Sequence, residues 1–349
     1  MKKLFILLFL YFFVLYTSSA CTTFFINKNG QLVFGRNYDW STGAGMVCTN
    51  LRGLQKTSMK ADDGKTISWV SEYGSITFNQ YGKEFPNGGM NENGLVVEVM
   101  WLDGSKYPEP DNRSAIGVLQ WIQYQLDRSA NVDAVIATDK IVRISSKAPP
   151  LHYLVADARG NVATIEFLNG KMVVHKGKEL PFPVLTNSTY DNSIQQTKGA
   201  NDTRSFNDNS IDRFAKACSM VQKFQLQNIN TPVVDYAFSI LDKVSQGKYT
   251  KWSIVYDITN KKISFRTDNF TNIKIISFSS FDFSCSSVSK MFNLNQNTKN
   301  EVSASFKKFT IDEGKPILET AIEESRNEIN INNKTKEALL NYSREIKCK

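Results

Sequence analysis

Cys21 is the residue with the most evident chemistry in this sequence, because of what stands before it. Met1–Lys3 is a short basic start, Leu4–Tyr16 is an uninterrupted apolar run of 13 residues, and Thr17–Ala20 is made of small residues. This order is typical of a secretory signal peptide that is cleaved at its small-residue end. The apolar run is too short to span a bilayer comfortably. We therefore expect residues 1–20 to be removed and Cys21 to become the N-terminal residue.

An N-terminal cysteine can act as a nucleophile without help from another side chain. A free α-amino group has a pKa of about 7.7–8.0, so near neutral pH it can accept the proton of the thiol on the same residue. The thiolate can then attack a carbonyl carbon. The chain has two histidines, His152 and His175, and we interpret both as structural. No motif typical of a metal or nucleotide site is present, so no cofactor is expected.

A lipid anchor is the alternative role for a cysteine at this position. Lipoprotein signals attach diacylglycerol to the thiol, but they usually carry Leu three residues before the cysteine, where this chain has Ser18. Four further cysteines are even in number and could pair in an oxidising compartment, which leaves Cys21 free. These four are Cys48, Cys218, Cys285 and Cys348, and the sequence does not decide which of them pair.

Two charged residues are expected close to Cys21. Asn29-Gly30 predicts a type I′ turn between two β-rich runs, and folding about that turn places Thr23 opposite Arg36. Arg36 then lies on the same face as Cys21, within about 7–8 Å at the backbone. A guanidinium at this range favours the thiolate and lowers the cysteine pKa. Asp39 follows at the strand end, where its carboxylate could meet the new amino group.

The elements that must position these groups are predicted to be hairpins flanked by helices. The length of 349 residues suits one large domain or two ordinary ones. Antiparallel hairpins beside paired helices indicate an α+β layered fold rather than a parallel doubly wound sheet. Residues 191–210 are expected to form a plain connecting loop, and residues 291–349 a peripheral segment with surface helices. Strands are expected at 151–156, 162–167, 172–175, 251–257 and 262–267, and helices at 114–126, 132–136, 212–225 and 233–244.

The charge of the chain points to no nucleic-acid partner. The 42 basic and 34 acidic residues give a net charge of +8. Removing Lys2 and Lys3 with the leader leaves 40 basic against 34 acidic residues, or +6. The positive charges are scattered without a basic block, as on a solvated surface. No other stretch is long and apolar enough for a membrane span, so we expect a secreted or periplasmic protein without stable membrane insertion.

Several short motifs, taken together, resemble the choloylglycine hydrolase family, which includes bile salt hydrolases and penicillin V acylases. They are Cys21, Gly35–Trp40, Gly89–Leu95, Leu185–Ser188 and Asp212–Phe214, in this order along the chain. The resemblance implies an N-terminal nucleophile hydrolase with a four-layer αββα sandwich of two antiparallel sheets. Residues 21–290 would form the catalytic domain. The implied reaction is hydrolysis of a linear, non-peptide amide C–N bond in a small N-acyl substrate.

The resemblance also implies a role for individual residues. Cys21 would be the nucleophile that forms an acyl-thioester, and Arg36 and Asp39 would be the charged pair beside it, with Asp39 holding the α-amine. Asn187 would donate a hydrogen bond to the oxyanion, and Arg213 would be the second arginine of the active site. Without the resemblance, Asn187 and Arg213 read as a turn residue and a helix-surface residue.

The chain departs from the family pattern at two places. Asn91 and Trp101 are expected at the substrate, but Trp101 stands where bile salt hydrolases carry Asn and many penicillin V acylases carry Tyr. Trp is a bulky apolar wall that suits an acyl or aryl group. Asn187 and Arg213 are only 26 residues apart, so the segment that assembles bile salt hydrolase tetramers is shortened. Homo-oligomerisation is therefore left open.

Three functions compete on the sequence alone. The first is an exported amidohydrolase that needs no cofactor. The second is a lipid-anchored binding protein in which Cys21 is an attachment point. The third is a binding protein of the same fold that has lost turnover. The sequence does not decide which acyl group and amine form the substrate.

Overall fold

The hairpin that carries the predicted catalytic residues opens the part of the chain that the structure describes. The structure is a computed structural model that describes residues 21–197 and 209–349, so the predicted signal peptide lies outside the described residues. β1 (Thr22–Lys28) and β2 (Gln31–Asp39) pair antiparallel, with Thr23 opposite Arg36. Asn29 and Gly30 both have positive φ, 52° and 78°, as a type I′ turn requires. The predicted register is therefore confirmed.

One large sheet is built around this hairpin. Within the described residues it has seven strands, antiparallel except for the last pair. Helices α4 (Ser210–Leu226) and α5 (Val233–Lys243) cover its outer face. The strand order is β14 (Val184–Leu185), β1, β2, β15 (Thr250–Asp257), β16 (Lys262–Thr267), β17 (Lys274–Ser277) and β19 (Asn300–Glu301).

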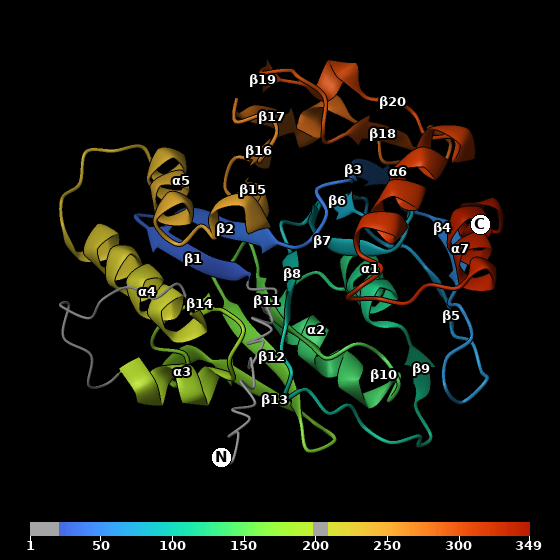
Figure 1. The fold of residues 1–349 in the computed structure, drawn as a ribbon, viewed down its shortest axis with the longest axis horizontal. Coiled ribbons are helices and arrows are strands. Elements are labelled where there is room, and N and C mark those ends of the chain that lie inside the picture. Colours follow the sequence, from blue (N-terminus) through green and yellow to red (C-terminus); the bar gives the residue numbers. More distant parts are fainter. Residues whose placement is uncertain (1–20, 198–208) are drawn as a thin grey trace, which may run out of the picture.

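The second large sheet packs against the first and is covered by α1 (Val118–Arg128) on its other face. Figure 1 shows the two sheets in the middle, with α4 and α5 on one side and α1 and α2 (Val132–Ala137) on the other. This arrangement confirms the α+β prediction of two sheets flanked by helices. Its strands in the described chain are β13 (Lys171–Lys176), β12 (Val162–Leu168), β11 (Leu151–Ala156), β8 (Val96–Trp101), β7 (Pro86–Asn91), β6 (Ser75–Asn79), β3 (Met46–Asn50), β18 (Lys290–Asn293) and β20 (Lys307–Lys308).

Central strands of both sheets are covered on two faces, which explains their sequence pattern. All residues of β3, β6 and β7 are buried, and the run Leu95–Leu102 around β8 is almost continuously apolar. Strands with one solvated face would alternate apolar and polar residues instead. None of the described helices has the length and apolar character needed to cross a bilayer.

Two predicted elements differ from the observed ones. The helix expected from residue 114 starts at Val118, because Ser114–Ile116 forms strand β9 beside β10 (Val142–Ile144). The loop expected at 191–210 begins as helix α3 (Tyr190–Thr197), and residues 198–208 lie outside the described chain.

Short 3₁₀ turns lie at η1 (Thr138–Lys140), η2 (Gly177–Glu179), η3 (Gly247–Tyr249), η4 (Phe278–Ser280), η5 (Ser303–Ser305) and η6 (Tyr342–Arg344).

The C-terminal segment is not peripheral, contrary to the prediction. β18 crosses the predicted boundary at residue 290 and pairs with β3 of the second sheet. Helices α6 (Ile311–Glu324) and α7 (Asn333–Asn341) bury apolar side chains against Tyr81 and Phe85. In Figure 1 these helices, coloured red, lie beside α1 and the edge of the same sheet. Residues 291–349 therefore contribute to the same core as the rest of the described chain.

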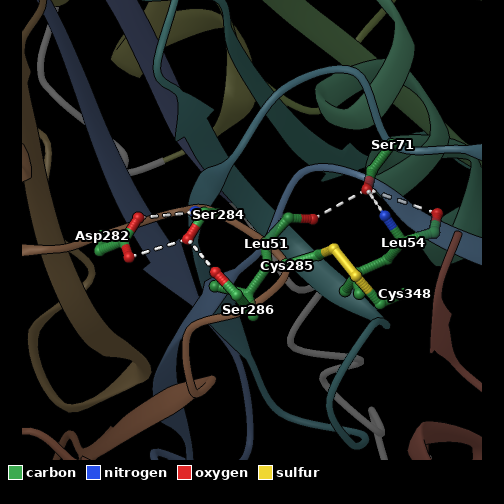
Figure 2. The surroundings of a disulfide bond; sticks show 8 residues. All are labelled: Leu51, Leu54, Ser71, Asp282, Ser284, Cys285, Ser286 and Cys348. Carbon is green, nitrogen blue, oxygen red and sulfur yellow. Dashed lines mark hydrogen bonds between the residues drawn. A yellow bond between two sulfur atoms is a disulfide. The ribbon is translucent and has the colours of Figure 1, made fainter.

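A disulfide between Cys285 and Cys348 fastens the end of this segment (Figure 2). Beside it, β21 (Lys347–Cys348) pairs with β4 (Leu54–Thr57), which also pairs with β5 (Ser68–Val70). Ser71 braces the adjoining turn, because its hydroxyl donates to Leu51 O and accepts from Leu54 N. Of the four cysteines that could pair, this bond uses two, and Cys48 and Cys218 are buried free thiols.

Loss of this disulfide should lower the stability of the whole domain. The bond closes a loop with a sequence separation of 63 residues, and cross-links of this kind contribute about 2–4 kcal/mol to the free energy of unfolding. Urea unfolding of the mature protein, followed by circular dichroism, should show a lower midpoint after reduction with dithiothreitol. The Cys285→Ser/Cys348→Ser variant should unfold at the reduced midpoint with or without reductant. Thiol counting must first show that the disulfide of the wild type is reduced. If the unfolding midpoint is then unchanged, this expectation is contradicted.

Candidate active site

The guanidinium of Arg36 lies beside the thiol of Cys21. Both side chains are buried, and Arg36 Nη2 is 3.9 Å from Cys21 Sγ. The contact follows from the hairpin register, which puts the two residues on one face as diagonal neighbours. The pairing predicted from the Asn-Gly turn therefore brings a cation to the predicted nucleophile.

Glu98 holds Arg36 in this position and was missed in the sequence analysis. Its carboxylate, on β8 of the second sheet, forms a fully buried ion pair with Arg36 Nη1 and accepts a hydrogen bond from the Tyr256 hydroxyl. Arg36 also donates to Asn87 O at 2.9 Å and to Val99 O at 2.8 Å. Glu98 is the one acidic residue inside the apolar run 95–102. Because a buried carboxylate needs a partner, this pattern could have predicted a buried ion pair.

A glycine on the neighbouring strand leaves room for this carboxylate. Gly88 lies opposite Glu98 in the β7–β8 ladder, and a Cβ added at Gly88 would collide with the Glu98 carboxyl group. A larger residue there would displace the acid from Arg36. Gly88, which directly precedes the Gly89–Leu95 motif, thus has a packing reason of its own.

Burial and the arginine act on the Cys21 thiol in opposite directions. Burial raises the pKa of Cys21 above its ordinary value, and the positive charge of Arg36 lowers it, so that the net shift is upward. The predicted direction of the Arg36 effect is confirmed, but burial outweighs it. For Arg36 itself, burial would lower the pKa, yet the Glu98 carboxylate raises it above the usual value, so the guanidinium stays charged.

Asp39 is the last residue of β2 and lies at the same place. Its backbone carbonyl is 3.9 Å from Cys21 Sγ, and its carboxylate Oδ1 accepts a hydrogen bond from the Thr250 hydroxyl. Among the described residues, the buried Oδ2 has no hydrogen-bond partner. Burial raises the pKa of Asp39 to about 7, although Arg213 and Thr250 act to lower it. The carboxylate therefore has a buried oxygen that can accept another donor.

Arg213 and Asn187 form a hydrogen-bonded chain on the other side of Cys21. Arg213, in the first turn of α4, donates at 2.7 Å to Cys21 O and to Thr22 Oγ1, and at 3.1 Å to Asn187 Oδ1. Because a guanidinium can only donate, it fixes the Asn187 amide with its oxygen toward Arg213. The Asn187 Nδ2 group then donates to Trp101 O at 2.8 Å and has a second N–H for another acceptor.

His152 supports the loop that carries Asn187. Its Nε2 donates to the carbonyl of Thr186, the preceding residue, at 2.6 Å. Its Nδ1 is 3.2 Å from Glu166, and Glu166 accepts a hydrogen bond from the backbone N–H of Tyr190, the first residue of α3. His152 thus holds the backbone on which Asn187 sits, in keeping with the structural role expected from the sequence.

A cavity of 240 Å³ adjoins Cys21 and Arg36. Its walls are almost entirely aromatic and aliphatic, and the Trp101 and Trp40 rings pack against each other at a tilt, with ring centroids 6.0 Å apart. Of the described residues that line it, Arg36 alone is cationic, and Glu98 neutralises that charge. Asn187 borders Trp101 without lining the cavity itself. Trp101 therefore lies at the wall of this apolar cavity.

Asn91 is not brought to the cavity, and the prediction that it contacts substrate is corrected. It lies at the turn between β7 and β8, whereas Trp101 ends β8 at the opposite end of the hairpin. Its Nδ2 donates to Leu126 O and Ser129 O, and its Oδ1 accepts from Leu95 N. Asn91 fixes the turn and docks it on α1.

Across residues 21–197 and 209–349, no three His, Cys, Asp or Glu side chains are grouped as metal ligands.

Comparison with known proteins gives one family and several relatives. The family model of linear amide C–N hydrolases, choloylglycine hydrolase family, matches residues 21–291 and so begins at Cys21. A penicillin V acylase of Pectobacterium atrosepticum is 28% identical over 241 residues, which cover 61% of this chain and 61% of the acylase. An uncharacterized protein of Paramecium bursaria Chlorella virus 1 is 24% identical over 286 residues, covering 65% of this chain and 99% of the viral protein.

Solved structures agree with this result. Penicillin V acylase from Agrobacterium tumefaciens has a TM-score of 0.72 and 26% identity, covering 83% of this chain and 98% of the acylase. A variant of the conjugated bile acid hydrolase from Clostridium perfringens has a TM-score of 0.66 at 15% identity, covers 80% of this chain and 98% of the hydrolase, and shares the fold. The family match spans most of the chain and starts at the residue beside which Arg36, Asp39 and Arg213 converge. The chain therefore belongs to the choloylglycine hydrolase family of linear amide C–N hydrolases.

Proposed function

We propose that this protein is an exported amidase that hydrolyses an N-acyl amide with an apolar acyl group, using Cys21 as its N-terminal nucleophile. The observation that carries the proposal is the position of the Cys21 thiol, 3.9 Å from the buried Arg36 guanidinium and at the wall of an apolar cavity. The family supplies the reaction class, a linear amide C–N hydrolase. The acyl group, the export and the individual roles below are the proposal.

Export and maturation are one step in this proposal. Cleavage after Ala20 would remove the basic, apolar leader and free the α-amino group of Cys21. The free Oδ2 of Asp39, buried at the same place, suits an ammonium group. An adjacent ammonium would also hold this carboxyl in its charged form, because an opposite charge lowers the pKa of an acid.

The reaction follows from these positions. The α-amine takes the thiol proton, and the thiolate forms a C–S bond to the amide carbonyl carbon. The carbonyl oxygen becomes an oxyanion, which the second N–H of Asn187 Nδ2 can stabilise. When this intermediate collapses, the C–N bond breaks and the ammonium returns its proton to the leaving amine. Water then hydrolyses the thioester by the reverse proton path and releases the acid.

The cavity supports an apolar acyl group. Its aromatic and aliphatic walls offer dispersion contacts and no free charge, so a charged acyl group would lose hydration without gaining a partner. Penicillin V acylases are among the relatives of this chain. Penicillin V, with its phenoxyacetyl group, is therefore the first amide to test, followed by N-alkanoyl amides.

Cys21→Ser should abolish turnover of a suitable amide. The serine hydroxyl has a far higher pKa than the thiol, so the α-amine cannot activate it equally, and kcat should fall at least about a thousandfold. The assay is the release of free amine from penicillin V and from N-alkanoyl amides, with circular dichroism to confirm folding. Cys218→Ser is the matched control, because it removes another buried thiol that does not line the cavity, and it should retain activity. Equal activity of Cys21→Ser and wild type would contradict the proposal, as would a wild type inactive on every amide.

Substitutions of Arg36 and of Glu98 should affect the pKa of the Cys21 thiol differently. Arg36→Gln removes the nearby cation and should raise the thiol pKa by about one unit or more. Glu98→Gln keeps the cation and removes the charge that offsets it, so the thiol pKa should stay or fall. The measurement is the pH dependence of Cys21 alkylation by iodoacetamide, followed by peptide mass spectrometry on the mature protein. An equal rise in both variants would mean that only packing is disturbed, and no rise in Arg36→Gln would contradict the assigned electrostatic role.

A further inference from the structure

Part of the cavity wall comes from the C-terminal segment, beyond the residues that match the family model. The match ends at residue 291, yet Ile329, Ile331 and Leu339 line the cavity beside Cys21. Ile329 and Ile331 lie in the connection between α6 and α7, and Leu339 lies on α7 and is buried. The apolar binding space is therefore completed by a segment outside the part that defines the family.

We propose that this segment, residues 329–339, determines which acyl groups this enzyme accepts, and that Leu339 sets the length of the acyl chain. The inference rests on the proposed function, since it concerns the substrate of that same site. Ile331 and Leu339 are specificity-determining residues in it. They belong to the wall of the cavity and have no part in the bond-making steps.

Leu339 is the decisive residue because it borders two hollows. A second cavity of 550 Å³ is also lined by Leu339, and it shares Val118, Leu119 and Pro149 with the cavity at Cys21. These shared residues form the partition between the two spaces. A shorter side chain at 339 would open the catalytic cavity toward the second one, and a larger side chain would reduce it.

A buried hydrogen-bond chain holds the end of α6, and Ile329 N, at the start of the segment, donates to Ser325 O at 2.9 Å. Trp40, itself a wall residue, donates from Nε1 to the Tyr81 hydroxyl at 2.9 Å, and that hydroxyl donates to Ser325 Oγ at 2.9 Å. Ser325 then donates to Ala321 O at 2.6 Å, at the C-terminal end of α6. The position of Trp40 and the position of the segment are thereby coupled.

The end of the segment is fixed as well. The Tyr342 hydroxyl, directly after α7, donates to Thr57 O of β4 at 2.8 Å. Farther along the chain, Cys348 pairs through β21 with β4 and is bonded to Cys285 (Figure 2). Leu339 therefore lies on a helix held on both sides, and a wall of this kind selects by size instead of adapting to each ligand.

The test compares acyl chain lengths in two opposite variants of Leu339. N-acyl-4-nitroanilides from butyryl to dodecanoyl are the probes, and kcat/KM is measured for each on the mature protein. Leu339→Ala should shift the preferred chain to longer acyl groups and raise the decanoyl-to-hexanoyl ratio of kcat/KM about tenfold, since one methylene in an apolar pocket changes binding by at least that factor. Leu339→Phe should shift the preference to shorter chains. Leu340→Ala is the matched control: it shortens the adjacent leucine of α7, which lines neither cavity, and should keep the wild-type profile.

The outcomes separate this inference from the proposed function. An active wild type with the same length profile in all three variants would overturn the role of Leu339 and leave the amidase intact. A wild type without activity on these anilides and on penicillin V would overturn the amidase. The role of the wall could then still be tested by binding: free fatty acids of the same chain lengths would compete with the fluorescent probe 11-(dansylamino)undecanoic acid, and their displacement of the probe would be measured. Leu339→Ala should favour longer acids in that assay as well, and an unchanged length preference would overturn the role of Leu339.

Discussion

The buried ion pair of Arg36 and Glu98 is the interaction on which the rest of the site depends. Arg36 is fully buried between the two sheets, where an unpaired charge would be strongly unfavourable, and Glu98 reaches it from the opposite sheet. The pair therefore needs both sheets in one relative position, a glycine at 88 and the register of the first hairpin. Because Arg36 Nη2 also lies next to Cys21, the same requirements that stabilise the core put a permanent cation beside the thiol.

A second arginine, Arg213, connects Cys21 with Asn187. Arg213 comes from α4 in the outer helical layer, yet it bonds both the Cys21 carbonyl and the Asn187 amide. Two guanidinium groups from different layers thus contact Cys21, Arg36 at its thiol and Arg213 at its carbonyl. Since neither can change its donor role, the orientation of Asn187 is set before a substrate binds, as electrostatic stabilisation of an oxyanion requires. The C-terminal segment then encloses the apolar space in front of this rigid arrangement.

The sequence predicted the features that depend on neighbouring residues, and it missed the contacts between segments that are far apart in the chain. The Asn29-Gly30 turn fixes the register of its hairpin, so Arg36 was placed beside Cys21 correctly, and the alternating hairpins and helices indicated the α+β class. Glu98 was missed because its partner comes from the other sheet, 62 residues away in sequence. Asn91 was misplaced because it lies at the turn of the β7–β8 hairpin, the full length of β8 away from Trp101 at the open end. The role of the C-terminal segment was missed because its few apolar residues are dispersed among Asn and Lys, and they meet only when α6 and α7 pack on the sheet edge.

The central claim is that a free, unmodified Cys21 is the N-terminal residue of the working protein. The most direct measurement is intact and N-terminal peptide mass spectrometry of the protein exported by a host with its own signal peptidases, before and after brief incubation with penicillin V. The account predicts a mass that begins at Cys21, one iodoacetamide label at that residue, and a transient phenoxyacetyl adduct on it. A diacylglyceryl group on Cys21 would block the thiol, and cleavage at another bond would leave Cys21 without a free α-amine; either result would contradict the account.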